Sequence, residues 1–120
     1  CAYVSDNHFT IDPKKPMSEM FKGSGVVKTK MTVRITNIDL VKNTAKIIGS
    51  NNTVEVVLIR NDMGFTLLEM NPSEVHTIVV YDTKTKNMDG NHFPTIHSRN
   101  LLIGKTGVSS QLSGVCRAKF

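Results

Sequence analysis

Four residues of one short predicted strand are the best candidates for chemistry in this sequence: Phe93, Thr95, His97 and Arg99. They alternate along the chain, and alternate residues of a β-strand share one face. If that face points inward, an imidazole and a guanidinium enter a mostly apolar cavity. The guanidinium would then fix the head group of an anionic amphiphile through charge-assisted hydrogen bonds. In the alternative orientation Ile96 points inward, and both polar side chains face solvent.

Two further features belong to this ligand-binding hypothesis. Tyr81, at the end of the preceding predicted strand, is included as a ligand-binding candidate. Gly114, Cys116 and Ala118 share one face of the last predicted strand, and their small size would leave room inside a barrel. The alternative interpretation is that these small residues let the N-terminal segment pack closely.

The spacing of the histidines argues against a metal site. His92 and His97 are five residues apart, which places them on opposite faces of an extended segment. His76 and His97 would meet only across strands, and two nitrogens without a carboxylate or thiolate partner make a weak site. We therefore predict no metal ligand and no cofactor.

No catalytic motif is recognisable. Residues 104–107 contain a Gly-Lys-Thr triplet, but the upstream glycine of a phosphate-binding loop and its following helix are missing. Ser98 follows His97 directly, so on a strand the two side chains point to opposite faces and the histidine cannot activate the hydroxyl. The carboxylates show no close pair for glycoside hydrolysis. The sequence therefore predicts a binding protein and not an enzyme.

Cys1 and Cys116 are the two cysteines, and they lie near opposite ends of the chain. A disulfide between them would tie the N-terminal segment to the last strand, and a loop of this length is stabilised by roughly 4 to 5 kcal/mol. The alternatives are free thiols, or a Cys1 that carries the lipid of a bacterial envelope lipoprotein. The bridge and the lipid exclude each other, and either indicates an environment outside the reducing cytosol.

The charge balance gives a net charge of +5, which favours an acidic partner. The charge is spread out, however, and neither Lys14-Lys15 nor residues 84–86 form a basic run of the kind found in nucleic-acid tails. Aromatic residues are only 6% of the chain, which is too few for a base-stacking platform. These observations argue against nucleic-acid binding. No apolar run approaches the length of a transmembrane helix.

The segment from Thr53 to Asp82 predicts three strands joined by two tight turns. Its β-branched and apolar runs are separated by residues 61–64, which end in glycine, and by residues 71–74, which include Pro72. Both faces of these strands carry apolar residues, so something should cover the outer face. The candidates are the N-terminal segment and a second copy in a homodimer.

Further strands are expected at residues 27–36, 45–48, 93–99, 101–103 and 109–120, with Pro94 marking an edge or a bulge. Residues 1–22 lack periodicity and are interpreted as an N-terminal arm. Within this arm, Pro16 favours a helical turn over residues 17–21. We therefore expect a single domain over residues 1–120, with the arm followed by a β-meander over residues 23–120.

The resulting fold class is all-β: an antiparallel up-and-down meander of about seven or eight strands that closes into a small barrel. A two-sheet β-sandwich is the alternative. In size and strand rhythm the chain resembles the small calycin-like barrels, which include lipocalins, fatty-acid carriers and avidins. The lipocalin Gly-x-Trp signature and the tryptophan of an avidin pocket are not in the sequence, so the resemblance implies a fold and no site residues.

These observations predict a secreted, periplasmic or cell-envelope protein that acts by binding. The first hypothesis is a carrier of a small apolar or anionic ligand, bound near Phe93, His97, Arg99 and Tyr81. The second is a protein–protein interaction or inhibitor module that uses surface loops such as residues 84–91, or the apolar outer face of the central strands. An inner cavity would favour the first, and a filled core with a partner would favour the second.

Overall fold

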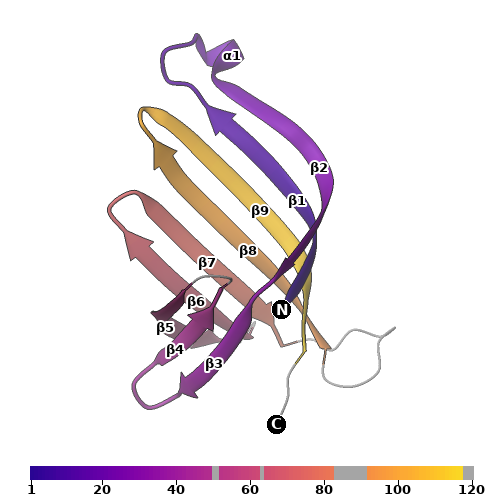
Figure 1. The fold of residues 1–120 in the computed structure, drawn as a ribbon, viewed down its shortest axis with the longest axis vertical. Helices are drawn as coiled ribbons and strands as arrows, with labels where there is room; N and C mark the ends of the chain where they lie inside the picture. Colours follow the sequence, from indigo (N-terminus) through magenta and orange to yellow (C-terminus); the bar gives the residue numbers. More distant parts are fainter. Residues whose placement is uncertain (50–51, 63, 83–91, 118–120) are drawn as a thin grey trace.

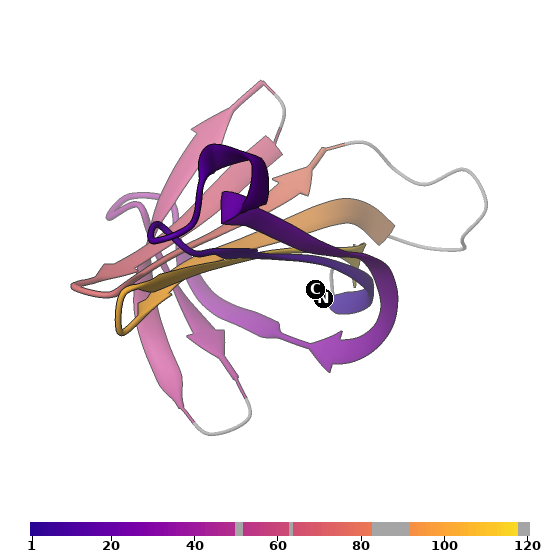
Figure 2. The same ribbon diagram turned by 90° about the horizontal axis from the view of Figure 1, so that it is seen from above.

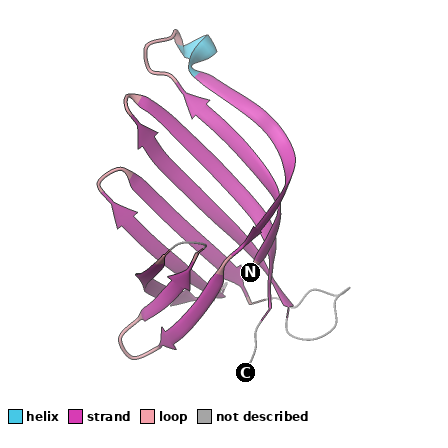
Figure 3. Ribbon diagram, viewed as in Figure 1, coloured by secondary structure: helices cyan, strands magenta, loops and turns pink. Residues whose placement is uncertain are grey.

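The structure is a computed structural model, and it describes residues 1–49, 52–62, 64–82 and 92–117, with the side chain of Ser24 left out. Within these ranges nearly all residues form β-strands, and one helical turn lies at an end of the sheet (Figures 1 and 3). The elements are β1 (Ala2–Ile11), α1 (Met17–Met20), β2 (Phe21–Thr32), β3 (Arg34–Asp39), β4 (Thr44–Ile48), β5 (Thr53–Asn61), β6 (Gly64–Asn71), β7 (Glu74–Tyr81), β8 (His92–Ile103) and β9 (Thr106–Arg117).

All nine strands belong to one antiparallel sheet with the order β2-β1-β9-β8-β7-β6-β5-β4-β3. From β3 to β9 each strand pairs with the next one in sequence, which confirms the predicted meander. The chain then returns, because β9 also pairs with β1. The all-β antiparallel class is therefore confirmed, and the single sheet differs from the two-sheet sandwich.

The two edges of the sheet, β2 and β3, are consecutive in sequence and separated only by Val33. The chain crosses there from one edge of the curved sheet to the other, as Figures 1 and 2 show. Two hydrogen bonds join the backbone of Val33 at this crossing to that of Cys1. The Cys1 nitrogen donates to the Val33 oxygen at 2.6 Å, and the Val33 N–H donates to the Cys1 oxygen at 2.8 Å. No described ladder joins β2 to β3, so hydrogen bonds do not close this sheet into the expected barrel.

The N-terminal segment is not an arm outside the sheet, and this expectation is wrong for residues 2–11. These residues form β1, which pairs with β2 on one side and β9 on the other. Gly114 makes the second pairing feasible, since a Cβ at this position would collide with the backbone oxygen of Ala2. The small residue thus serves close packing of the N-terminal segment and does not leave space. The helical turn after Pro16 is confirmed as α1.

Other boundaries differ from the expectations for local reasons. The predicted strand at residues 27–36 is divided at Val33 into the end of β2 and the start of β3. Residues 21–26 form the first part of β2, which contains a register shift near Gly25 (φ 74°). Residues 101–103 extend β8 and form no separate strand. Pro94 was expected to mark an edge or a bulge, but β8 is a central strand between β7 and β9. The ladder between β7 and β8 ends at Thr95, so Pro94 has no partner on β7.

The core lies on one face of the sheet, called the inner face below. Its largest fully buried side chains are Tyr3, Leu67, Ile78 and Thr95. On the opposite, outer face, Val57, Ile59 and Met70 stay 51%, 47% and 67% exposed. Since β1 is part of the sheet, the N-terminal segment does not cover this apolar surface. That expectation is also wrong.

Candidate functional site

A row of polar side chains crosses five strands on the inner face, and we call it the polar row. Cα-paired residues of neighbouring antiparallel strands direct their side chains to the same face. The pairs that define the row are Glu69 with His76, His76 with Arg99, Arg99 with Ser110, and Ser110 with His8. Arg99 is therefore central, with a histidine and a serine as its cross-strand neighbours.

The next row toward the core is mostly apolar and contains His97. It is formed by Leu67, Ile78, His97, Leu112 and Asp6. His97 is only 5% exposed, and its ring packs against that of Tyr3 with a centroid distance of 5.6 Å.

The alternating face predicted from the sequence is the inner face. Thr95 and His97 are buried there, and Phe93 and Arg99 are partly buried. Ile96 lies on the other face, so the alternative orientation does not occur. The role of the four residues in ligand binding stays a prediction.

Tyr81 does not join these residues. It follows Val80, which is buried on the inner face, and alternation therefore places Tyr81 on the outer face. The expected cavity around His97 is occupied by core side chains, among them Tyr3 and Leu67. The half of the sheet nearer α1 extends beyond β3, β4 and β5 (Figure 1).

A hydrogen-bonded chain links Glu74, His76 and His97. The Nε2 of His76 lies 2.8 Å from the Glu74 carboxylate, and its Nδ1 lies 3.4 Å from the Nε2 of His97. In the tautomer in which the Nε2–H of His76 donates to the carboxylate and its Nδ1 accepts, the Nε2–H of His97 donates to that Nδ1. The Nδ1 of His97 is then a lone-pair acceptor, and it is buried without a described partner.

Burial determines the protonation of this chain. Desolvation, together with the charges of His76 and Arg99, lowers the pKa of His97 to about 4. The hydrogen bond from His76 lowers the pKa of the Glu74 carboxyl. Burial raises the pKa of Tyr3, against the hydrogen bond with Thr95. Near neutral pH this hydrogen-bonded chain therefore contains an ionised Glu74 and a neutral His97.

The Nε of Arg99 is buried and has no hydrogen-bond acceptor among the residues that the structure describes. On one side lies Ser110, whose hydroxyl is 2.9 Å from the Nδ1 of His8. In the next row toward the β8–β9 turn, Leu101 and Val108 are paired on the same face. The arrangement can thus bind an acceptor oxygen at Arg99, beside a hydroxyl and an imidazole and below two apolar side chains.

Sequence reasoning missed two of these contacts. Glu74 is two residues before His76 on one strand, so alternation alone was a signal that the two side chains share a face. The contact between His8 and Ser110 had no such signal, because it depends on the register between β1 and β9. Within the described ranges, no three His, Cys, Asp or Glu side chains gather in a way that could hold a metal ion.

The sulfurs of Cys1 and Cys116 lie at disulfide-bonding distance, as predicted. This pairing ties the start of β1 to the end of β9 and is incompatible with a lipid on the Cys1 sulfur of the same molecule. No helical segment in the described part of the chain has the length and apolar character needed to cross a membrane. Residues 84–91, predicted as an interaction loop, and Ala118 lie outside the described residues.

Comparison with known proteins found no matching family model, no matching curated protein and no matching solved structure.

Proposed function

We propose that the chain is a non-enzymatic binding protein that holds a small anionic amphiphile on the polar row, with Arg99 as the anchoring cation. The observation that carries this proposal is the Nε–H of Arg99, which is buried and has no acceptor among the described residues. A buried donor without a partner costs about 1 to 3 kcal/mol, and more when the group is charged. A ligand oxygen bound there would offset this cost.

The surroundings of Arg99 favour a carboxylate with a short apolar tail. Leu101 and Val108, in the row next to Arg99 and Ser110, offer apolar contacts. Asp6, Glu69 and Glu74 lie on the same face within one or two rows, and their negative charges oppose a second negative charge on the ligand. A carboxylate monoanion therefore suits this site better than a phosphate dianion.

Calorimetric titration with octanoate tests the proposal, with octanol and inorganic phosphate as comparison ligands. Octanoate is expected to bind more tightly than either. Arg99→Gln removes a charge-assisted hydrogen bond of about 1.5 to 3 kcal/mol and should weaken octanoate about 10-fold to 100-fold. Arg34→Gln is the matched control, since Arg34 is exposed on β3. Equal affinities for octanoate and octanol, or equal effects of the two variants, would contradict the proposal.

The cysteine pair supports a location in an oxidising compartment, such as the periplasm or the extracellular space. A protein in such a compartment would carry no thiol that reacts with a thiol reagent before reduction. Labelling of both cysteines in protein taken directly from its native compartment would argue against this location.

A protein–protein interaction is the second candidate function. It is favoured by the exposed apolar residues Val57, Ile59 and Met70 on the outer face. Sedimentation at several protein concentrations tests whether this face joins two copies, and Ile59→Lys should then shift the equilibrium to monomer. A monomer at all concentrations would leave this face to a different partner.

A further inference from the structure

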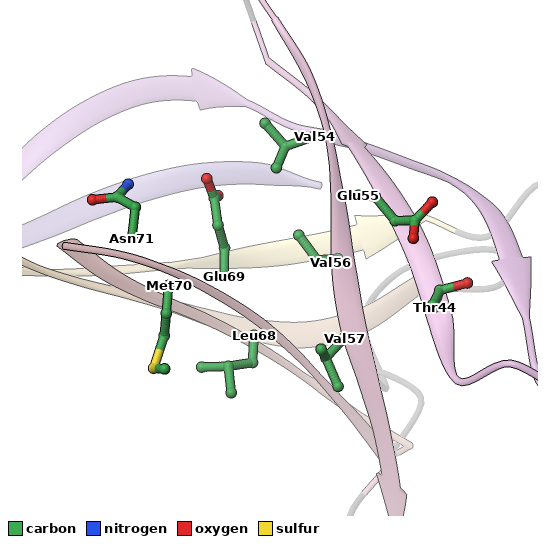
Figure 4. A pocket seen from close by; sticks show the side chains of 9 residues that line it. All are labelled: Thr44, Val54, Glu55, Val56, Val57, Leu68, Glu69, Met70 and Asn71. Atoms are coloured by element: carbon green, nitrogen blue, oxygen red, sulfur yellow. The ribbon is translucent and has the colours of Figure 1, made fainter.

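The strands β5 and β6 separate before they end. Their ladder runs from the hairpin turn to the pair Val57 and Leu68. Beyond this pair, residues 53–56 of β5 pair only with β4, and residues 69–71 of β6 pair only with β7. The separation leaves an opening of about 500 Å³ between the two strands (Figure 4), which we call the β5–β6 fork.

Both arms of the fork direct unpaired backbone groups into the opening. The N–H of Leu58 donates to the oxygen of Asn43 at 2.8 Å, so the backbone groups of Leu58 point toward β4. Backbone groups alternate in direction along a strand, and those of Thr53 and Glu55 therefore point into the fork. By the same alternation from the Val57 and Leu68 pair, the N–H and C=O of Met70 point into it from the other side. No described ladder pairs these groups.

The side chains around the fork combine apolar contacts with two carboxylates. On the inner side Val54 and Val56 face Glu69, and on the outer side Glu55 and Met70 belong to opposite arms of the fork (Figure 4). Among the described residues that line the opening there is no lysine or arginine. Each side of an inserted strand would therefore meet one carboxylate and at least one apolar side chain.

We propose that the β5–β6 fork binds an extended peptide in which Lys or Arg alternates with apolar residues. The peptide adds a strand, and its backbone pairs with Glu55 on one arm and Met70 on the other. Its basic side chains share one face and meet Glu55 on the outer side, while its apolar side chains contact Val54 and Val56 beside Glu69 on the inner side. Two forks facing each other would bring these carboxylates together, so charge disfavours a second copy as the occupant. The fork shares Glu69 with the polar row, but Arg99 does not line the opening, and the inference does not depend on octanoate binding.

The probe is the peptide acetyl-Thr-Val-Lys-Val-Lys-Val-Thr-amide, compared with a twin that carries Glu at both Lys positions. Binding is followed by fluorescence anisotropy of labelled peptide and by amide ¹H–¹⁵N shifts of the protein. The Lys peptide should bind, the Glu twin should bind at least about tenfold more weakly, and the largest shifts should occur at Glu55 and Met70.

Two variants separate charge from backbone pairing. Glu55→Lys reverses a carboxylate of the fork and should weaken the Lys peptide about tenfold, whereas Glu19→Lys makes the same change on exposed α1 and should have no effect. Met70→Pro removes the N–H that points into the fork and spares the ladder with β7, so it should also weaken binding. Urea unfolding verifies that each variant is folded.

Several results would overturn the inference: equal binding of the Lys and Glu peptides, equal effects of Glu55→Lys and Glu19→Lys, or amide shifts confined to the β2 edge. Concentration-dependent shifts of Glu55 and Met70 without peptide, together with a dimer in sedimentation, would assign the fork to a second copy instead. Arg99→Gln should leave peptide binding unchanged, which separates a failure here from a failure of the anion site.

Discussion

Acidification should destabilise this protein through His97. The imidazole is 5% exposed, and burial lowers its pKa from 6.5 to about 4. In the unfolded chain the same group titrates at its ordinary value. Between these two values the unfolded state binds more protons than the folded state, so folding stability falls as the pH falls. The contribution of His97 is complete above about pH 6.5 and decreases through the window down to about pH 4.

The size of the effect follows from the shift. The two pKa values of His97 differ by about 2.5, and at about 1.4 kcal/mol for each tenfold change this gives a limit near 3.4 kcal/mol, reached below the folded pKa. Between about pH 7.5 and about pH 4.5 the expected loss is about 2.5 kcal/mol. This is a large share of the roughly 5 to 15 kcal/mol that stabilises a domain.

Urea unfolding at a series of pH values measures this loss, with His97→Leu and His97→Gln as variants that cannot titrate. The other ionisable groups are common to all three proteins, so the difference between their pH dependences isolates His97. Both variants should show a pH dependence that is smaller by about 2.5 kcal/mol than that of the natural sequence. Parallel curves for the three proteins would refute the assignment of a neutral, buried His97.

Two further predictions concern the attachment of β1. Cys116→Ser should lower the free energy of unfolding by roughly 4 to 5 kcal/mol in urea, because the lost bridge would close almost the whole chain; a loss under about 1 kcal/mol would show that the bridge does not constrain the unfolded state. Gly114→Ala introduces a Cβ that collides with the Ala2 backbone, so it should cost about 2 kcal/mol or more in the same assay and raise amide exchange along β1. Unchanged exchange there would contradict the close approach of β1 and β9.

The central meander could be predicted because its signals are local. Gly64, at the end of the first turn, has a φ of 141°, which L side chains rarely adopt, and the next turn contains Pro72. These residues specify the reversals, and the β-rich runs between them need only pair with their sequence neighbours. The result is the observed succession of β5, β6 and β7.

The position of β1 could not be predicted in this way. Its partner β9 is about a hundred residues away, and the pairing is set by the bridge at Cys1, the burial of Tyr3 and the small residue at Gly114. None of these has a periodic signature in residues 1–22. The same register creates the contact between His8 and Ser110, so this part of the polar row could not be predicted from the sequence either.

For His97 and Arg99, alternation predicted a shared face, but the filled core was not predictable. Whether a barrel keeps a cavity depends on which large side chains meet from distant strands, and here Tyr3 and Leu67 occupy the centre. The proposed ligand site is therefore at Arg99 in the polar row and not in the interior.

The most direct test of the central claim is to observe the Nε–H of Arg99 itself. A ¹H–¹⁵N spectrum of the arginine side chains, assigned with Arg99→Gln, is recorded while octanoate is added at neutral pH. We predict that the Arg99 Nε–H signal shifts downfield in a saturable way and exchanges more slowly with water, while the Arg34 signal stays in place. An Arg99 signal that does not respond, or that moves together with Arg34, would contradict anion binding at the polar row.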